Sequence, residues 1–111
     1  MIKLSIGDGM DLEEFSKRLS TLRINKDVSA RNMSLSIGQS AGYINNIENN
    51  VSLPSMETFF YICEYLGISE QEFFDIENAN PIKTRELLSE IKGLDNKQID
   101  SLLTIIRGLK S

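Results

Sequence analysis

The chain of 111 residues carries 12 basic and 16 acidic residues, a net charge of −4, one cysteine and no histidine. Without histidine it lacks the commonest general base near neutral pH and the commonest metal ligand. The single Cys63 can form neither an internal disulfide nor a Cys-His nucleophile. We therefore expect no enzymatic activity, no catalytic residue, no metal site and no cofactor.

The sequence also lacks targeting signals for a membrane. No stretch approaches the ~20 consecutive apolar residues that cross a bilayer. Residues 1–10 lack the basic start and apolar run of a signal peptide. Together with the lone cysteine, these features predict a reducing, cytoplasmic location and no membrane partner.

Charge is unevenly distributed along the chain. From Lys17 to Arg31 there are five basic residues and one acidic residue, whereas from Asn32 to Ile82 there is no Lys or Arg against seven acidic residues. A net negative charge argues against a nucleic acid partner, but the distribution of charge matters more than its sum. The positive charge lies near the front of the chain.

The first predicted elements are an N-terminal arm and a helix. Residues 1–10 alternate apolar and polar positions before Gly-Asp-Gly, which fits a short strand, an arm or disorder. Asp11 is a predicted N-cap, with Glu14 three residues later, so a helix should run to about Lys26. Its apolar face comprises Leu12, Phe15, Leu19 and Leu22.

Two short helices follow, separated by a glycine. Ser29 is the predicted cap of the first, which Gly38 ends. Ser40 is the predicted cap of the second, which Asn49-Asn50 ends. The residues that we expect to face inward are Met33, Ile37, Ile44 and Ile47.

A fourth and a fifth helix complete the predicted core. The fourth begins at Pro54-Ser55 and ends at Gly67, and the fifth opens with a capping box of Ser69 and Glu72. The residues expected in the core, including a buried Cys63, are Met56, Phe59, Phe60, Cys63, Leu66, Phe73 and Phe74.

Residues 81–111 are predicted to form a helical hairpin. One helix starts at Pro81 after the cap Asn80 and ends at Gly93, and the next opens with Asp95 and Gln98. The short linker between them favours an antiparallel pair. Their apolar surface is broader than one two-helix contact needs, which indicates an interface between two copies of the chain. The predicted dimer-interface residues are Leu87, Leu88, Ile91, Leu102, Leu103, Ile106 and Leu109.

The most informative stretch is the pair of short helices around Gly38. Two such helices joined by a tight glycine turn pack at a steep angle and leave one of them protruding. A helix about 10–12 Å wide fits the major groove of B-DNA, which is about 12 Å wide.

From Phe15 to Asp75 the chain resembles the phage repressor and Cro-like helix-turn-helix family, also called the xenobiotic-response-element type. The strongest match is the run Tyr-Ile-Asn-Asn-Ile-Glu-Asn at residues 43–49, followed by Pro-Ser and Leu-Gly-Ile-Ser at the family's spacing. The resemblance implies an all-α fold, with a five-helix repressor-like domain over residues 11–77. It also implies a recognition helix over residues 40–48 and a structural ion pair between Arg23 and Glu48.

The resemblance implies sequence-specific binding of double-stranded DNA by a transcriptional regulator, most often a repressor. Base contacts are expected from Ala41, Gly42, Asn45 and Asn46. Contacts to the DNA backbone are expected from Lys26, Arg31, Ser40, Tyr43, Asn49 and Asn50. The chain departs from the family at Ala30, where Gln often anchors a phosphate, and at Ala41 and Gly42, where Arg, Lys or Gln is common.

Two functions remain open at this point. The first is a homodimeric regulator on a two-fold-symmetric operator. The alternative is an acidic helical protein-interaction module, such as an adaptor or an antitoxin-like partner, with weak or no DNA binding. The absence of Lys and Arg between Arg31 and Lys83 favours this alternative. Either function is compatible with a regulatory protein partner.

Overall fold

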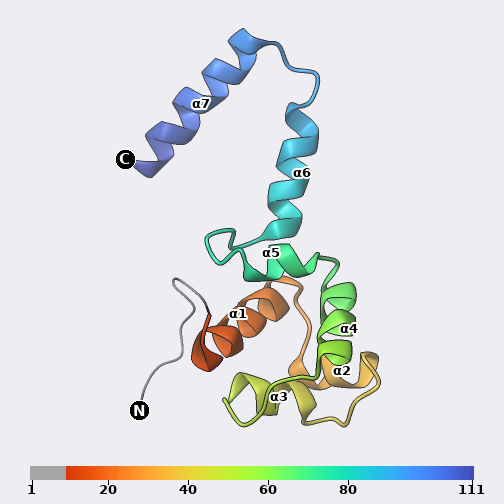
Figure 1. Cartoon of the computed structure of the whole chain (residues 1–111). Helices are drawn as coiled ribbons and strands as arrows, with labels where there is room; N and C mark the ends of the chain where they lie inside the picture. The colour runs from red at the N-terminus through yellow and green to blue at the C-terminus, as the bar shows by residue number, and fades with distance from the viewer. Residues whose placement is uncertain (1–9) are drawn as a thin grey trace. The chain divides into compact units, whose positions relative to one another are not determined.

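A computed structural model describes residues 10–111 (Figure 1). Over these residues the chain has seven helices and no strand, which confirms the predicted all-α class. It divides into two units, Met1–Pro81 and Ile82–Ser111. The predicted N-terminal arm lies outside the described residues except for Met10, which packs partly buried against the core.

The first unit holds five helices, α1 (Leu12–Asn25), α2 (Ala30–Ser36), α3 (Tyr43–Glu48), α4 (Met56–Leu66) and α5 (Glu70–Phe74). Three predicted N-caps, Asp11, Ser29 and Ser69, are confirmed, because each accepts a hydrogen bond from the backbone N–H three residues later. The fourth helix, which was predicted to begin at Pro54-Ser55, is capped in the same way by Ser55.

Left-handed residues follow α1, α2, α3 and α4. Gly38 and Gly67 have φ of +80° and +73°, and Asp27 and Asn50 adopt the same conformation with φ of +60° and +63°. Asp and Asn are the side chains that tolerate this conformation best after glycine. At the end of α3, the N–H of Val51 donates to the carbonyl of Asn46 at 2.9 Å, which satisfies a free carbonyl of the last turn.

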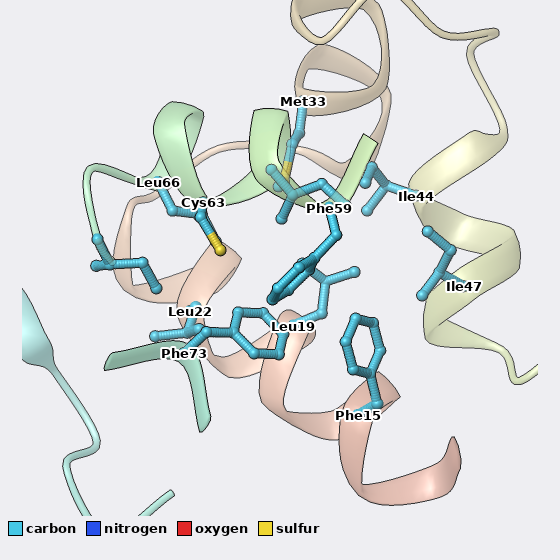
Figure 2. Packing of buried hydrophobic residues seen from close by; sticks show 12 residues of the cluster. Phe15, Leu19, Leu22, Met33, Ile44, Ile47, Phe59, Cys63, Leu66 and Phe73 are labelled. Atoms are coloured by element: carbon cyan, nitrogen blue, oxygen red, sulfur yellow. The ribbon is translucent and has the colours of Figure 1, made fainter. Parts of the chain in front are cut away.

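One hydrophobic core fills the first unit (Figure 2). Phe73 lies at its centre, with ring centroids 5.0 Å from both Phe15 and Phe59. Cys63 is 1% exposed, and burial raises the pKa of its thiol to about 12, so the prediction of a buried cysteine is confirmed. The core residues are Phe15, Leu19, Leu22, Met33, Ile44, Ile47, Phe59, Ile62, Cys63, Leu66, Ile68 and Phe73.

The apolar stripe of α4 is narrower than predicted. Phe60 and Phe74 are each 49% exposed, and Met56 is 68% exposed, so their assignment to the core was wrong. The buried stripe is Phe59, Ile62, Cys63 and Leu66. Phe60 follows Phe59 by one residue, about 100° around the helix, and therefore points away from the core.

The second unit contains most of α6 (Pro81–Ile91) and all of α7 (Asn96–Lys110). Pro81 begins α6, and Asp95 and Gln98 form the predicted capping box of α7. No residue from Ile82 to Ser111 is fully buried. The predicted antiparallel hairpin therefore stays a prediction. None of the helices described for residues 10–111 has the length and apolarity that crossing a membrane requires.

Candidate nucleic-acid interface

Helix α3 packs one face against α1 and α2 and leaves the other exposed. Ile44 and Ile47 on its inner face are both 0% exposed. Asn45 and Asn46 on its outer face are exposed. Figure 2 shows the two isoleucines directed from α3 into the core.

The start of α3 differs from the prediction. The helix begins at Tyr43 instead of Ser40, and no side chain of its own caps it. Residues 40–42 form a turn in which the carbonyl of Ser40 accepts the N–H of Tyr43 at 3.1 Å, so the Ser40 hydroxyl lies too early to cap the helix.

A serine of α2 supplies the missing cap. The Oγ of Ser34 accepts the N–H of Ile44 at 2.9 Å and donates to the carbonyl of Ala30 at 2.7 Å. Ser34 is 0% exposed, so this bond forms away from water. It satisfies one of the backbone N–H groups that a helix leaves free in its first turn.

A second buried serine holds the other end of α3. The Oγ of Ser16 on α1 donates to the carbonyl of Ile47 at 2.6 Å and also contacts the carbonyl of Leu12 at 3.0 Å. Our sequence reasoning missed both serines. The sequence indicates only that both serines lie on the inward faces of their helices. Ser16 stands three residues before Leu19, and Ser34 stands three residues before Ile37.

The ion pair implied by the family resemblance is present. The Nε and Nη2 of Arg23 donate to the two carboxylate oxygens of Glu48 at 2.7 and 2.9 Å, and Nη1 donates to the carbonyl of Val28 at 2.8 Å. The hydrogen bonds that Arg23 donates to Glu48 raise the pKa of Arg23, so the guanidinium stays charged. The pair neutralises the carboxylate at the end of α3.

Arg18 has a structural role that the sequence reasoning missed. Its side chain is buried, with Nε donating to the carbonyl of Phe73 at 2.6 Å and Nη2 donating to those of Glu72 and Asp75 at 2.8 and 2.9 Å. Burial lowers the pKa of Arg18, and the charge of Asp75 opposes that shift. Arg18 closes the end of α5 and contributes no charge to an exposed basic surface.

Two basic residues that were predicted to contact the DNA backbone, Arg31 and Lys26, have different surroundings. Arg31 is exposed in the first turn of α2, the helix that precedes the glycine turn. The ammonium of Lys26 lies 5.2 Å from the ring centroid of Tyr65, so its side chain is directed toward α4. The structure therefore does not bring Lys26 and α3 together.

The other predicted contact residues surround α3. Gly42 is exposed, and a Cβ added there would meet nothing within 4 Å. Tyr43 is partly buried against the core, so only part of its side chain faces solvent. We call the following set the α3 surface: Ser40, Ala41, Gly42, Tyr43, Asn45, Asn46, Asn49 and Asn50.

Comparison with known proteins supports this geometry. The profile of a family described as "Helix-turn-helix domain" matches residues 16–78, more than half of the chain. Neither a curated protein nor a solved structure matches the chain significantly. The chain belongs to the helix-turn-helix domain family of the Cro/C1 type, whose fold implies DNA binding.

Proposed function

We propose that this protein is a sequence-specific, double-stranded DNA-binding regulator of transcription that inserts α3 into the major groove. The observation that carries this proposal is the two-sided character of α3. Ile44 and Ile47 are fully buried, whereas Asn45 and Asn46 are exposed and, among the residues that the structure describes, nothing lies within 4 Å of a Cβ built at Gly42. A helix presented in this way can approach base edges without any change in the core.

The hydrogen bonds at the ends of α3 support base reading. Discrimination between bases needs donors and acceptors held in a fixed geometry. Ser34 and Ser16 hold the first and last turns, and the Arg23–Glu48 pair fixes the side chain that follows Ile47. Asn45 and Asn46 therefore project from a restrained backbone.

We assign the contacts to DNA as follows. Ala41 and Gly42, at the start of the recognition segment, lie against base edges, and Asn45 and Asn46 hydrogen-bond to them. Neutral groups and one exposed guanidinium position the phosphate backbone. These backbone contacts come from Arg31, Ser40, Tyr43, Asn49 and Asn50, with Lys26 contributing if its side chain leaves Tyr65.

We further propose that the protein acts as a homodimeric repressor through α6 and α7. Leu87 and Leu88 are 54% and 53% exposed, and Leu109 is 80% exposed, which leaves apolar surface in contact with water. Pairing across a two-fold axis would bury that surface and set two recognition helices about 34 Å apart on a symmetric operator. The other residues of this interface are Ile91, Leu102, Leu103 and Ile106.

One observation favours a second function. Arg18 is buried and Arg23 is paired, so two of the five basic residues between Lys17 and Arg31 are engaged inside the fold. A domain with so little exposed positive charge is also suited to act as a protein-interaction module that binds DNA weakly.

Binding of the full-length chain to fluorescent duplexes separates the two functions. The regulator should bind duplexes selected from a random pool roughly 10³-fold more tightly than random duplexes. The double variant Asn45→Ala/Asn46→Ala should lose this preference. Gln71→Ala, which removes an exposed amide from α5, is the matched control and should retain it. Equal affinity of the wild type for all duplexes would favour the protein-interaction module.

A further inference from the structure

The outward face of α3 consists of amides and one glycine. Its residues are spaced i, i+3, i+4 and i+7, which places them on one side of a helix. They lie opposite Ile44 and Ile47, and all of them are exposed. The four residues are Gly42, Asn45, Asn46 and Asn49.

This face carries no free charge. Glu48 is the one ionisable side chain between Tyr43 and Asn50 apart from the Tyr43 phenol, and Arg23 occupies both of its carboxylate oxygens. Its side chain is only 12% exposed. A base in the groove therefore meets neutral amides, each offering one acceptor oxygen and one donor nitrogen.

An amide matches one base edge better than the others. Adenine presents an N6 amino donor beside the N7 acceptor, so an Asn side chain can make both hydrogen bonds at once. Guanine presents two acceptors, N7 and O6, which call for two donors such as those of Arg or Lys. Neither Arg nor Lys occurs between Asn32 and Ile82.

From these observations we infer that each operator half-site carries adenines at the positions facing Asn45 and Asn46, and that α3 makes no bidentate contact to guanine. This inference rests on the proposed DNA-binding function and specifies the base class that the site reads.

The local structure allows the α3 backbone to approach the bases closely, as the short Asn side chain requires. Asn reaches less far than Arg, Lys or Gln, so the α3 backbone must lie close to the bases. Gly42 presents no side chain on the same face, and the space beside it is open. The hydrogen bond that the Ser34 hydroxyl accepts from the N–H of Ile44 keeps the first turn of α3 from fraying where this close approach occurs.

Selection from a randomised duplex pool with the full-length chain tests the base class. The wild type should enrich half-sites with adenines at two positions. Repeating the selection with Asn45→Ala and with Asn46→Ala should erase the preference at one position each and so identify which residue reads which base. Both side chains are exposed, and circular dichroism checks that the variants fold.

Atomic substitution in the selected duplex then tests the mode of contact. Replacing an enriched adenine by 7-deazaadenine removes only the N7 acceptor and should weaken wild-type binding roughly five- to tenfold. The variant lacking the matching Asn should show no further loss, and 7-deazaguanine at guanines elsewhere should have no effect. Enrichment of guanine at these positions, or binding insensitive to 7-deazaadenine, would overturn the inference while DNA binding stands. If no sequence is enriched, the proposed function itself fails, and the inference with it.

Discussion

Ser34 on α2 caps the neighbouring helix α3 by accepting the N–H of Ile44 at 2.9 Å. The two residues are ten positions apart, and the glycine turn at Gly38 lies between them. The bond ties the two helices of the helix-turn-helix together through a buried polar contact. It makes the orientation of α3 depend on a residue that lies outside that helix.

Replacing Ser34 by Ala should therefore destabilise the protein. The change leaves the buried N–H of Ile44 without its partner, which costs about 1–3 kcal/mol. Urea denaturation followed by circular dichroism measures the effect. The matched control is Ser36→Ala, because Ser36 is an exposed serine of the same helix and should tolerate the change. Equal unfolding midpoints for the two variants would show that the Ser34 bond contributes nothing.

The sequence predicted correctly the features that depend on residues close together in the chain. Asp11, Ser29 and Ser69 were predicted correctly because an N-cap and the N–H that it binds lie within three residues. The spacing of Ile44 and Ile47 correctly predicted the buried side of α3 and so the exposed side. These features need no knowledge of the tertiary fold.

The features that were missed or wrong depend on contacts across the fold. Ser16 and Ser34 bind backbone groups of another helix. Arg18 binds the carbonyl of Phe73, which lies 55 residues later in the chain. Their spacing from core residues shows that they lie on an inward face, but it does not show which backbone groups they bind. Ser40 failed as a cap because the turn after Gly38 takes up residues 40–42, so the helix starts at Tyr43 instead of directly after Ser40.

The Arg23–Glu48 pair should be strongly coupled. Both side chains are largely buried, at 17% and 12% exposed, so Glu48→Ala leaves a poorly solvated guanidinium and should cost about 3 kcal/mol of unfolding free energy. A double-mutant cycle with Arg23→Met isolates the interaction between the two groups. Glu57→Ala is a suitable control, because Glu57 is an exposed acid in the first turn of α4. A coupling energy near zero would indicate that each residue acts alone.

Arg31→Ala should weaken binding to every duplex alike. Its exposed guanidinium in the first turn of α2 is our assigned phosphate contact, and neutralising one phosphate fewer should reduce the slope of log K against log salt by about one per protomer. Anisotropy titrations over a series of salt concentrations measure the slope. Lys17→Ala is the control, since Lys17 is exposed on α1 and lies 3.7 Å from Glu13. If both variants change the slope equally, the effect reflects overall charge instead of a contact.

The buried thiol should make stability fall at alkaline pH. Burial raises the pKa of Cys63 from 9.0 to about 12, so the folded state keeps its proton in a range where the unfolded chain loses it. The unfolding free energy should therefore decline as the pH rises above about 9. Comparing Cys63→Ala with the wild type across this range isolates the contribution of the thiol. Parallel pH profiles for the two proteins would contradict the assignment.

The last prediction concerns assembly, and the structure defines where the chain should be cut. The truncation should remove Ile82–Ser111 and keep Pro81, because Pro81 is buried and belongs to the first unit. The first unit has its own caps and one closed core, so residues up to Pro81 should fold alone. They should sediment as a monomer.

If α6 and α7 form the dimer interface, this truncation should bind an operator more weakly by roughly 10²–10⁴-fold, because the effective concentration of the second half-site is lost. The double variant Leu103→Lys/Ile106→Lys in the full-length chain should have the same effect, since both residues lie on the apolar face of α7 and are each 37% exposed. Ser101→Lys, on the same helix, is the control and should leave the protein dimeric. A truncated chain that still dimerises, or a full-length chain that is monomeric at micromolar concentration, would show that α6 and α7 do not form a dimer interface.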